Sequence, residues 1–180
     1  MNNRKVVLYI SMSLDGFIAT ENDDLSWLSV VEQEGLNYGY QAMLDRSDTY
    51  IVGKKTYDVV LSLTSGKFPQ ADLFDCYVIT RQELNPEKGI TFYNGNLSEL
   101  ITTLKSKPGK DIYCDGGGQI VKLLMEHDLI DEYIISVIPV VLGNGKRLFH
   151  GGTPGFDLKL VKSESFETGL VQMHYARKRD

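Results

Sequence analysis

The feature that most constrains the fold is the triple glycine Gly116-Gly117-Gly118, which lies inside a stretch running from Lys110 to Phe149. Before it, the apolar, β-prone residues 112–114 predict a short strand that stops at Asp115. After it, apolar residues recur at the spacing of a helix, at Ile120, Leu123, Leu124 and Met125. A β-rich run from Tyr133 to Val141 follows. Strand, helix and strand predict a crossover unit, whose ligands lie outside the carboxyl ends of the strands.

The glycine turn has the chemistry to hold a phosphate group. Glycines let another group approach the backbone, and the helix that follows offers unpaired N–H groups and the positive end of its dipole. Neither the dinucleotide fingerprint G-x-G-x-x-G nor the P-loop sequence is present. A strand-to-helix turn without any ligand uses the same residues. The turn therefore supports a nucleotide site only as a hypothesis.

Length, composition and charge narrow the class of protein. With 180 residues, 42% of them hydrophobic, the chain predicts one domain over residues 1–180 with a substantial core. The net charge of −5 and the absence of a basic run argue against nucleic acid and favour a small-molecule partner. The first apolar segment is too short for a secretory signal or a membrane span. We therefore expect a cytoplasmic protein with no membrane partner.

The cysteines and histidines point to structural rather than metal-binding roles. Cys76 and Cys114 lack C-x-x-C spacing and lie in apolar runs, which predicts two buried side chains and no disulfide. The three histidines match no metal-binding spacing, so no metal site is predicted; they are His127, His150 and His174.

The remaining pattern predicts further strands and helices. Strands are expected at Val6 to Ser13, Thr49 to Val52, Cys76 to Thr80 and Ile90 to Tyr93, with a C-terminal hairpin of Leu158 to Ser165 and Leu170 to Ala176. A mobile, irregular loop is expected from Asp15 to Asp24. Ser26 is expected to cap a helix that carries Trp27, and helix is expected again over residues 36–44. Asn96 is expected to cap a helix with Leu97, Leu100, Ile101 and Leu104 facing inward.

Basic residues follow two of these strands. Gly53 turns the second strand into a helix that begins with Lys54, Lys55 and Thr56. Cations avoid the N-terminal end of a helix dipole, so a bound anion would account for the two lysines, and a solvated charged turn accounts for them as well. Arg81 follows the third strand and could pair with a second phosphate, although a surface arginine needs no ligand.

The order of these elements resembles the dihydrofolate reductase fold over nearly the whole chain. SLDGFIA at 13–19 and LIDEYIISVIPVVLGNGKRLF at 129–149 look more like the reductase domain of riboflavin biosynthesis, the RibD C-terminal domain, and its stand-alone relatives. This resemblance implies an α/β fold with an eight-stranded, mostly parallel sheet, flanking helices and a C-terminal antiparallel hairpin. It also implies an NADPH-dependent oxidoreductase that transfers hydride to a small pyrimidine-, pterin- or sugar-derived acceptor, as 5-amino-6-(5-phosphoribosylamino)uracil reductase does.

The resemblance also implies site residues, motif by motif. The NADPH site would comprise Ser11, Ile18, Ala19, Gly53, Lys54, Lys55, Thr56, Thr80, Arg81, Asp115, Gly116, Gly117, Gly118, Gln119 and Ile120. Within it, Thr80 and Arg81 match the place where the 2′-phosphate is read. The acceptor would contact Tyr9, Trp27 and Ser136, and the loop from Asp15 to Asp24 would act as a lid. Glu32, five residues after Trp27, is the candidate acid that organises proton delivery; an ordinary exposed helix glutamate fits the same position.

Several alternatives remain open at this stage. Dihydrofolate reduction ranks lower, because no arginine occurs between Lys55 and Thr80 to hold a folate tail, and Lys67 is the only basic residue there. A nucleotide-binding module without turnover is a third alternative. A homodimer could use residues 137–142 and 143–155, although an internal strand followed by an ordered loop explains the same residues.

Overall fold

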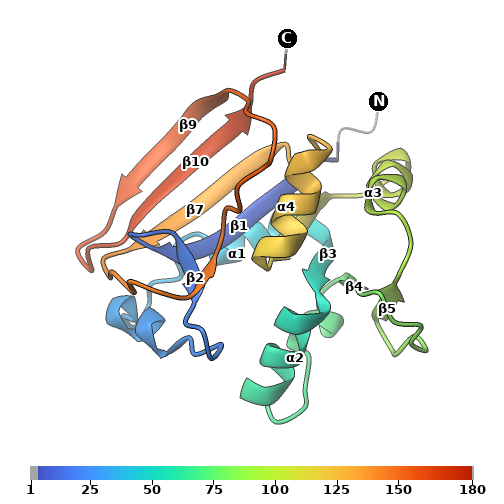
Figure 1. Cartoon of the computed structure of the whole chain (residues 1–180), viewed down its shortest axis with the longest axis horizontal. Coiled ribbons are helices and arrows are strands. Elements are labelled where there is room, and N and C mark those ends of the chain that lie inside the picture. The colour runs from blue at the N-terminus through green and yellow to red at the C-terminus, as the bar shows by residue number, and fades with distance from the viewer. Residues whose placement is uncertain (1–3, 180) are drawn as a thin grey trace.

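The sheet is built around β1 (Val6–Ser13), which lies between two parallel neighbours, β6 (Asp111–Gly116) and β7 (Glu132–Ile138). Val6, Val7 and Leu8 are completely buried, as expected for a strand covered on both faces. The computed structural model describes residues 4–179 and is shown in Figure 1. Among these residues, no helix is both long and apolar enough to cross a membrane.

Eight strands form the main sheet in the order β5-β4-β3-β6-β1-β7-β10-β9. The strands from β5 to β7 in this order run parallel, and β10 and β9 complete the sheet as an antiparallel hairpin. The other bounds are β3 (Ser47–Gly53), β4 (Asp75–Ile79), β5 (Ile90–Tyr93), β9 (Leu158–Ser165) and β10 (Val171–Arg177). The predicted fold class is therefore confirmed.

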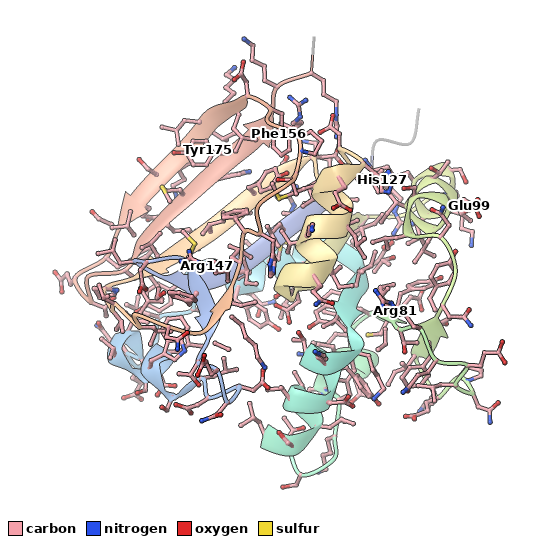
Figure 2. All side chains as sticks on the ribbon, viewed as in Figure 1. Arg81, Glu99, His127, Arg147, Phe156 and Tyr175 are labelled. Carbon is pink, nitrogen blue, oxygen red and sulfur yellow. The ribbon has the colours of Figure 1, made fainter. Side chains whose placement is uncertain are left out.

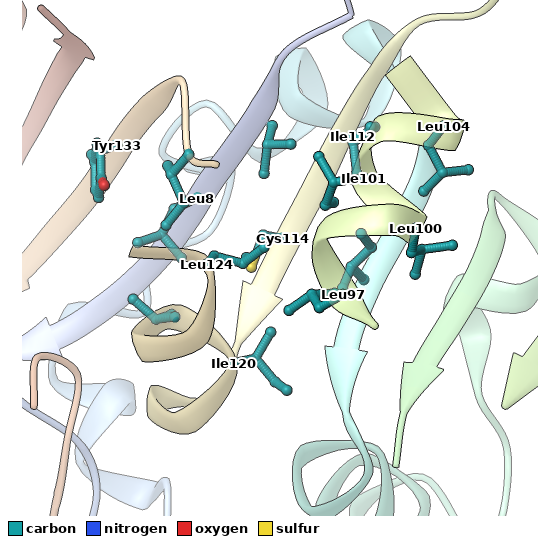
Figure 3. Close-up of a cluster of buried hydrophobic side chains, with 14 of the residues drawn as sticks. Leu8, Leu97, Leu100, Ile101, Leu104, Ile112, Cys114, Ile120, Leu124 and Tyr133 are labelled. Carbon is teal, nitrogen blue, oxygen red and sulfur yellow. The ribbon is translucent and has the colours of Figure 1, made fainter. Parts of the chain in front are cut away.

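Helices cover the two faces of the sheet. In Figure 1, α3 (Leu97–Ser106) and α4 (Gly118–Glu126) lie on the face turned toward the viewer, and α1 (Tyr40–Arg46) lies behind the sheet. Figure 3 shows side chains of α3 and α4 converging on Leu8 and Cys114. On the other face, α2 (Lys54–Leu63) packs Tyr57 against a second apolar cluster that contains Cys76. Both cysteines are thus buried hydrophobic residues, as predicted.

Some predicted boundaries were wrong. The strand expected to stop at Asp115 continues through Gly116, which pairs with Val52 of β3. The Trp27 segment is a 3-10 helix, η1 (Ser26–Val31). The Ser26 hydroxyl donates a hydrogen bond to the Asp24 carboxylate and does not cap the helix. Helix resumes only at Tyr40, because Gly35 and Gly39 have left-handed backbone conformations, with φ of 81° and 85°, that interrupt a right-handed helix. A short 3-10 helix, η2 (Pro69–Asp72), lies in the segment expected to be loop.

The loop expected from Asp15 to Asp24 is also more regular than predicted. It contains β2 (Phe17–Ala19), which pairs antiparallel with β8 (Lys146–Arg147) in a separate two-stranded sheet. Its partner strand lies more than a hundred residues away in the chain, so local turn chemistry could not reveal it.

Candidate functional site

The predicted site residues follow the carboxyl ends of five adjacent parallel strands. In the order β4, β3, β6, β1 and β7, these ends carry Thr80 and Arg81, then residues 53–56, then residues 115–118, then Ser11, then Ser136. Figure 2 labels Arg81 beside the end of β4. Sheet topology therefore places at one edge residues that are scattered over more than a hundred positions of the chain.

The glycine turn between β6 and α4 is closely surrounded. Gly116 has φ of 95°, a left-handed conformation that favours glycine, and its peptide bond to Gly117 is cis. A Cβ on Gly117 would lie 3.0 Å from the Thr56 hydroxyl oxygen and 3.6 Å from the Ile18 side chain. Three predicted cofactor residues from three separate elements thus meet at this turn.

The start of α4 is exposed on one side and packed on the other. Gly117 caps the helix without any side-chain hydrogen bond, so the first helical N–H groups have no acceptor from a cap. Gln119 is exposed, whereas Ile120 is buried against Gly53, where a Cβ would lie 2.9 Å from it. A Cβ on Gly118 would overlap the carbonyl oxygen of Arg147. Gly118 is therefore required for packing, and a side chain at Gly117 would crowd the Thr56 hydroxyl.

The basic residues at this edge differ in their freedom to bind an anion. Lys54 pairs with Asp58 one helical turn further along α2, at 2.5 Å, and its ammonium lies 5.5 Å from the centre of the Tyr57 ring. Lys55 and Arg81 are exposed. The Thr80 hydroxyl accepts a hydrogen bond from the backbone N–H of Gln82, at 3.1 Å, and so shapes the turn after β4. Lys55 and Arg81 are therefore the better candidates for phosphate contacts.

A cavity of about 500 Å³ opens beside the ends of β1 and β7. This volume lies in the range usual for small-molecule sites. Four predicted site residues line it: Tyr9, Ser11, Glu32 and Ser136. The rest of the lining comes from η1, from the segment 33–40, and from Ile138 and Leu170. We call this cavity the acceptor pocket.

Two polar side chains in the lining of the acceptor pocket, on β1 and β7, are in register with a polar residue of β10 that does not line it. Ser11 of β1 pairs in register with Ser136 of β7, and Ser136 pairs in register with Gln172 of β10. The Gln172 side-chain amide donates to the Ser136 hydroxyl oxygen at 3.0 Å and to the Tyr38 carbonyl at 2.8 Å. Sequence patterns did not predict that Gln172 contributes to the site. Its only local signal is a polar residue in a predicted strand.

The wall of the acceptor pocket is fixed by Tyr38. Its carbonyl oxygen also accepts a hydrogen bond from the Tyr9 hydroxyl at 3.0 Å, and its ring packs edge-on against Phe166, with centroids 4.9 Å apart. Its own hydroxyl donates to the carbonyl of Val31. The pocket is therefore largely shaped before any ligand enters.

Asp115 lies behind the acceptor pocket rather than in its lining. Its two carboxylate oxygens accept hydrogen bonds from the hydroxyls of Tyr50 and Tyr113, the latter at 3.0 Å. The Tyr113 ring meets the Tyr9 ring edge-on, with centroids 6.0 Å apart. Burial raises the pKa of Asp115 to about 6, although the two tyrosine hydrogen bonds act in the opposite direction.

Hydrogen bonds and an ion pair join the loop 15–24 to the segment 142–147 at the carboxyl edge of the sheet. The Asp15 carboxylate accepts hydrogen bonds from the Ser13 hydroxyl at 2.6 Å and from the backbone N–H groups of Leu142 and Gly143. Lys146 pairs with Asp23, and the Arg147 guanidinium lies 4.6 Å from the centre of the Phe17 ring. The predicted lid is thus anchored at several points in this conformation.

Three further predicted site residues differ from one another in burial: Trp27 and Ala19 are buried, and Glu32 is exposed. Trp27 is buried against Ile138 and Leu170, so it supports the wall of the acceptor pocket and does not line it. Ala19 is buried in β2, next to β8. Glu32 lies at the C-terminal end of η1, is exposed and lines the pocket. Glu32 therefore combines access to solvent with access to the pocket.

Comparison with known proteins agrees with this architecture. The sequence profile of the RibD C-terminal domain matches residues 4–172. The protein YwjB of Bacillus subtilis (strain 168), itself uncharacterized, is 42% identical over 97% of this chain and 98% of its own length.

Solved structures show the same fold. A protein of Shewanella sp. PV-4 named for riboflavin biosynthesis has a TM-score of 0.87 and 30% identity, over 97% of this chain and 99% of its own. A dihydrofolate reductase of Enterococcus faecalis in complex with NADP(H) has a TM-score of 0.64 and 13% identity, over 97% of each chain, which shows likeness of fold alone. Profile, identity and sheet topology agree, and the chain belongs to the RibD C-terminal domain family.

Proposed function

We propose that the protein is an NADPH-dependent reductase that transfers hydride to a small pyrimidine-, pterin- or sugar-derived acceptor. The observation that carries this proposal is the order of groups along the carboxyl edge. Arg81, the glycine turn and the acceptor pocket follow one another on the strands from β4 to β7. An extended dinucleotide presents its 2′-phosphate, pyrophosphate and nicotinamide in the same order. β4 and β1 are three strand spacings apart, about 14 Å.

The residues of the glycine turn fit the pyrophosphate. The space beside Gly117 that a Cβ would fill borders the Thr56 hydroxyl, which can donate a hydrogen bond to a phosphate oxygen. The first N–H groups of α4 and of α2 point to the same edge of the sheet and favour negative charge. Arg81 and Lys55 would add positive charge at the adenosine end.

At the other end, the acceptor pocket would hold the reacting ring. NADPH, when bound, supplies the hydride, and the oxidised cofactor leaves as NADP⁺. The chain's own task is to orient the acceptor in a site that excludes bulk water. Ser11 and Ser136 lie on the pocket floor and would orient the acceptor by hydrogen bonds. If a C=N bond is reduced, its nitrogen needs one proton, and Glu32, which lines the pocket, would organise that delivery.

The test of the cofactor site is a comparison of NADPH and NADH affinities by calorimetry. Arg81→Ala should weaken NADPH binding about ten-fold and leave NADH binding nearly unchanged, since only NADPH carries the 2′-phosphate. Gly117→Ala should weaken both cofactors, because its methyl group would occupy the space beside Thr56. Gly151→Ala is the matched control, because a Cβ there meets nothing within 4 Å.

Two outcomes would contradict this function. An unchanged ratio of NADPH to NADH affinity in Arg81→Ala would remove the assigned 2′-phosphate contact. NADPH that binds but is never oxidised with pterin, pyrimidine or aldehyde acceptors would instead identify a nucleotide-binding module without turnover.

A further inference from the structure

The acceptor pocket has an unusual charge balance for a family linked to a phosphorylated acceptor. Among residues 4–179, its lining contains three tyrosines, two serines and two glutamates, but no lysine, arginine or histidine. The two glutamates, Glu32 and Glu34, are both exposed at the pocket. A phosphate group in such a pocket would meet negative charge and no cation to neutralise it.

The tyrosines supply no positive charge, because a tyrosine side chain is either neutral or anionic. Burial raises the pKa of Tyr9 to about 12, and burial, followed by the nearby Asp115, raises the pKa of Tyr40. Both hydroxyls are therefore neutral at physiological pH. Their rings offer flat apolar surface that suits a planar heterocycle and attracts a positively charged one.

Three other cations at this edge of the sheet already have partners, and the remaining two, Lys55 and Arg81, are assigned above to the cofactor. Lys146 pairs with Asp23, Lys54 pairs with Asp58, and the Arg147 guanidinium stacks on Phe17. A phosphate on the acceptor would have to compete with these contacts, and none of the three residues lines the pocket.

The neutral floor indicates what the acceptor presents instead. Ser136 accepts its hydrogen bond from Gln172, so its own hydroxyl hydrogen remains available for a ring carbonyl or ring nitrogen. Glu32 can accept hydrogen bonds from ring N–H or amino groups. The sheet floor therefore offers a hydrogen-bond donor, Ser136, and the end of η1 offers an acceptor, Glu32.

Resting on the proposed reductase function, we propose that the acceptor is a planar heterocycle without phosphate or other anionic groups, uncharged or singly positive, which binds between the Ser11–Ser136 floor and Glu32. Such an acceptor differs from a phosphoribosyl compound by the absence of the phosphate.

Binding of matched probes to the full chain tests this proposal. One pair is 5-amino-6-(ribosylamino)uracil and its 5′-phosphate, and the other is 6-hydroxymethylpterin and pterin-6-carboxylate, each titrated by calorimetry. The uncharged member should bind at least about ten-fold more tightly than its anionic partner. Equal or tighter binding of the anionic members would overturn the proposal, and so would the absence of binding by both uncharged members.

Variants show whether the charge of the lining causes the preference. Glu34→Lys should reduce the preference for the uncharged probes about ten-fold, and Glu34→Gln should reduce it by a smaller factor. Glu99→Gln removes the same charge on α3, away from the pocket, and should change nothing (Figure 2). An unchanged preference in both Glu34 variants would overturn the proposal.

A separate titration with NADPH distinguishes a failure of the reductase function from a failure of the proposed selectivity of the pocket. Protein that binds the uncharged probes but not NADPH would contradict the reductase function and leave the pocket's selectivity standing. Protein that binds NADPH but prefers the anionic probes would contradict only the selectivity.

Discussion

Asp115 is a residue at which burial and charge are opposed. It follows directly on three buried residues of β6 and precedes the glycine turn, and its only recorded side-chain donors are Tyr50 and Tyr113 among residues 4–179. Because burial outweighs these two hydrogen bonds, the pKa of Asp115 rises to about 6. Through the Tyr113 ring, which meets Tyr9, this carboxylate supports the wall of the acceptor pocket from behind.

Asp115 should make stability fall as pH rises. Between its ordinary pKa of 3.8 and its folded value of about 6, the unfolded chain ionises Asp115 before the folded chain does. Its contribution is therefore present at low pH and is lost as pH rises through about 6, by at most about 3 kcal/mol. Urea unfolding across this range should show the loss in the wild type and not in Asp115→Asn. Parallel pH profiles for the two proteins would contradict the assignment.

At the scale of elements, α3 is the clearest case in which local sequence specifies a helix. The Asn96 side chain accepts hydrogen bonds from the backbone N–H groups of Ser98, at 2.8 Å, and Glu99, at 3.2 Å. Glu99 in the first turn also suits the helix dipole. The four predicted inward residues are all buried: Leu97, Leu100, Ile101 and Leu104. Figure 3 shows them on the side of α3 that faces the sheet.

Loss of this cap should cost measurable stability. Asn96→Ala leaves two N–H groups of α3 without their acceptor, so the free energy of unfolding should fall by about 1 kcal/mol. Asn96→Asp keeps an acceptor of the same length and should retain most of the stability. Urea denaturation of the three proteins gives the comparison. Equal losses in both variants would show that the cap bond itself does not stabilise the helix.

At the scale of the whole molecule, the two edges of the sheet have different roles. The carboxyl edge carries the candidate site, and the amino edge carries ion pairs that join distant segments. There Glu132 pairs with Lys5 at 2.6 Å and with Arg46 at 2.9 Å, and it lies 3.0 Å from His174. Burial opposes ionisation of Glu132, but the bonds from Lys5 and Arg46 outweigh it and lower its pKa to about 2. This network links β1, α1, β7 and β10.

Glu132 should act on stability in the sense opposite to Asp115. Its folded pKa of about 2 lies below the ordinary value of 4.5, so its contribution is present above pH 4.5 and is lost as pH falls toward 2. The loss should amount to at most about 3 kcal/mol. Glu132→Gln should flatten this acid limb in thermal unfolding measured at several pH values. An acid limb as steep as that of the wild type would contradict the role of Glu132.

Features that depend on residues close together in the chain could be predicted from the sequence, and features that depend on distant residues could not. Most strands of the main sheet, the Asn96 cap and the helix start at Lys54 were predicted correctly, because each depends on neighbours within a few residues. The pairing of Lys54 with Asp58 was not predicted, although residues four apart face each other on a helix. The resemblance added the family and the fold class.

The sequence by itself thus determined most elements of the main sheet, their order and the glycine turn, because periodicity and turn chemistry are local properties. Only the tertiary structure decided that β2 pairs with β8, that Gln172 orients Ser136, and that Trp27 supports the acceptor pocket from behind. It also decided the pocket's lack of cations, because the lining comes from four separate parts of the chain. The physical reason is that burial and charge balance depend on which distant segments meet, and tertiary packing decides that.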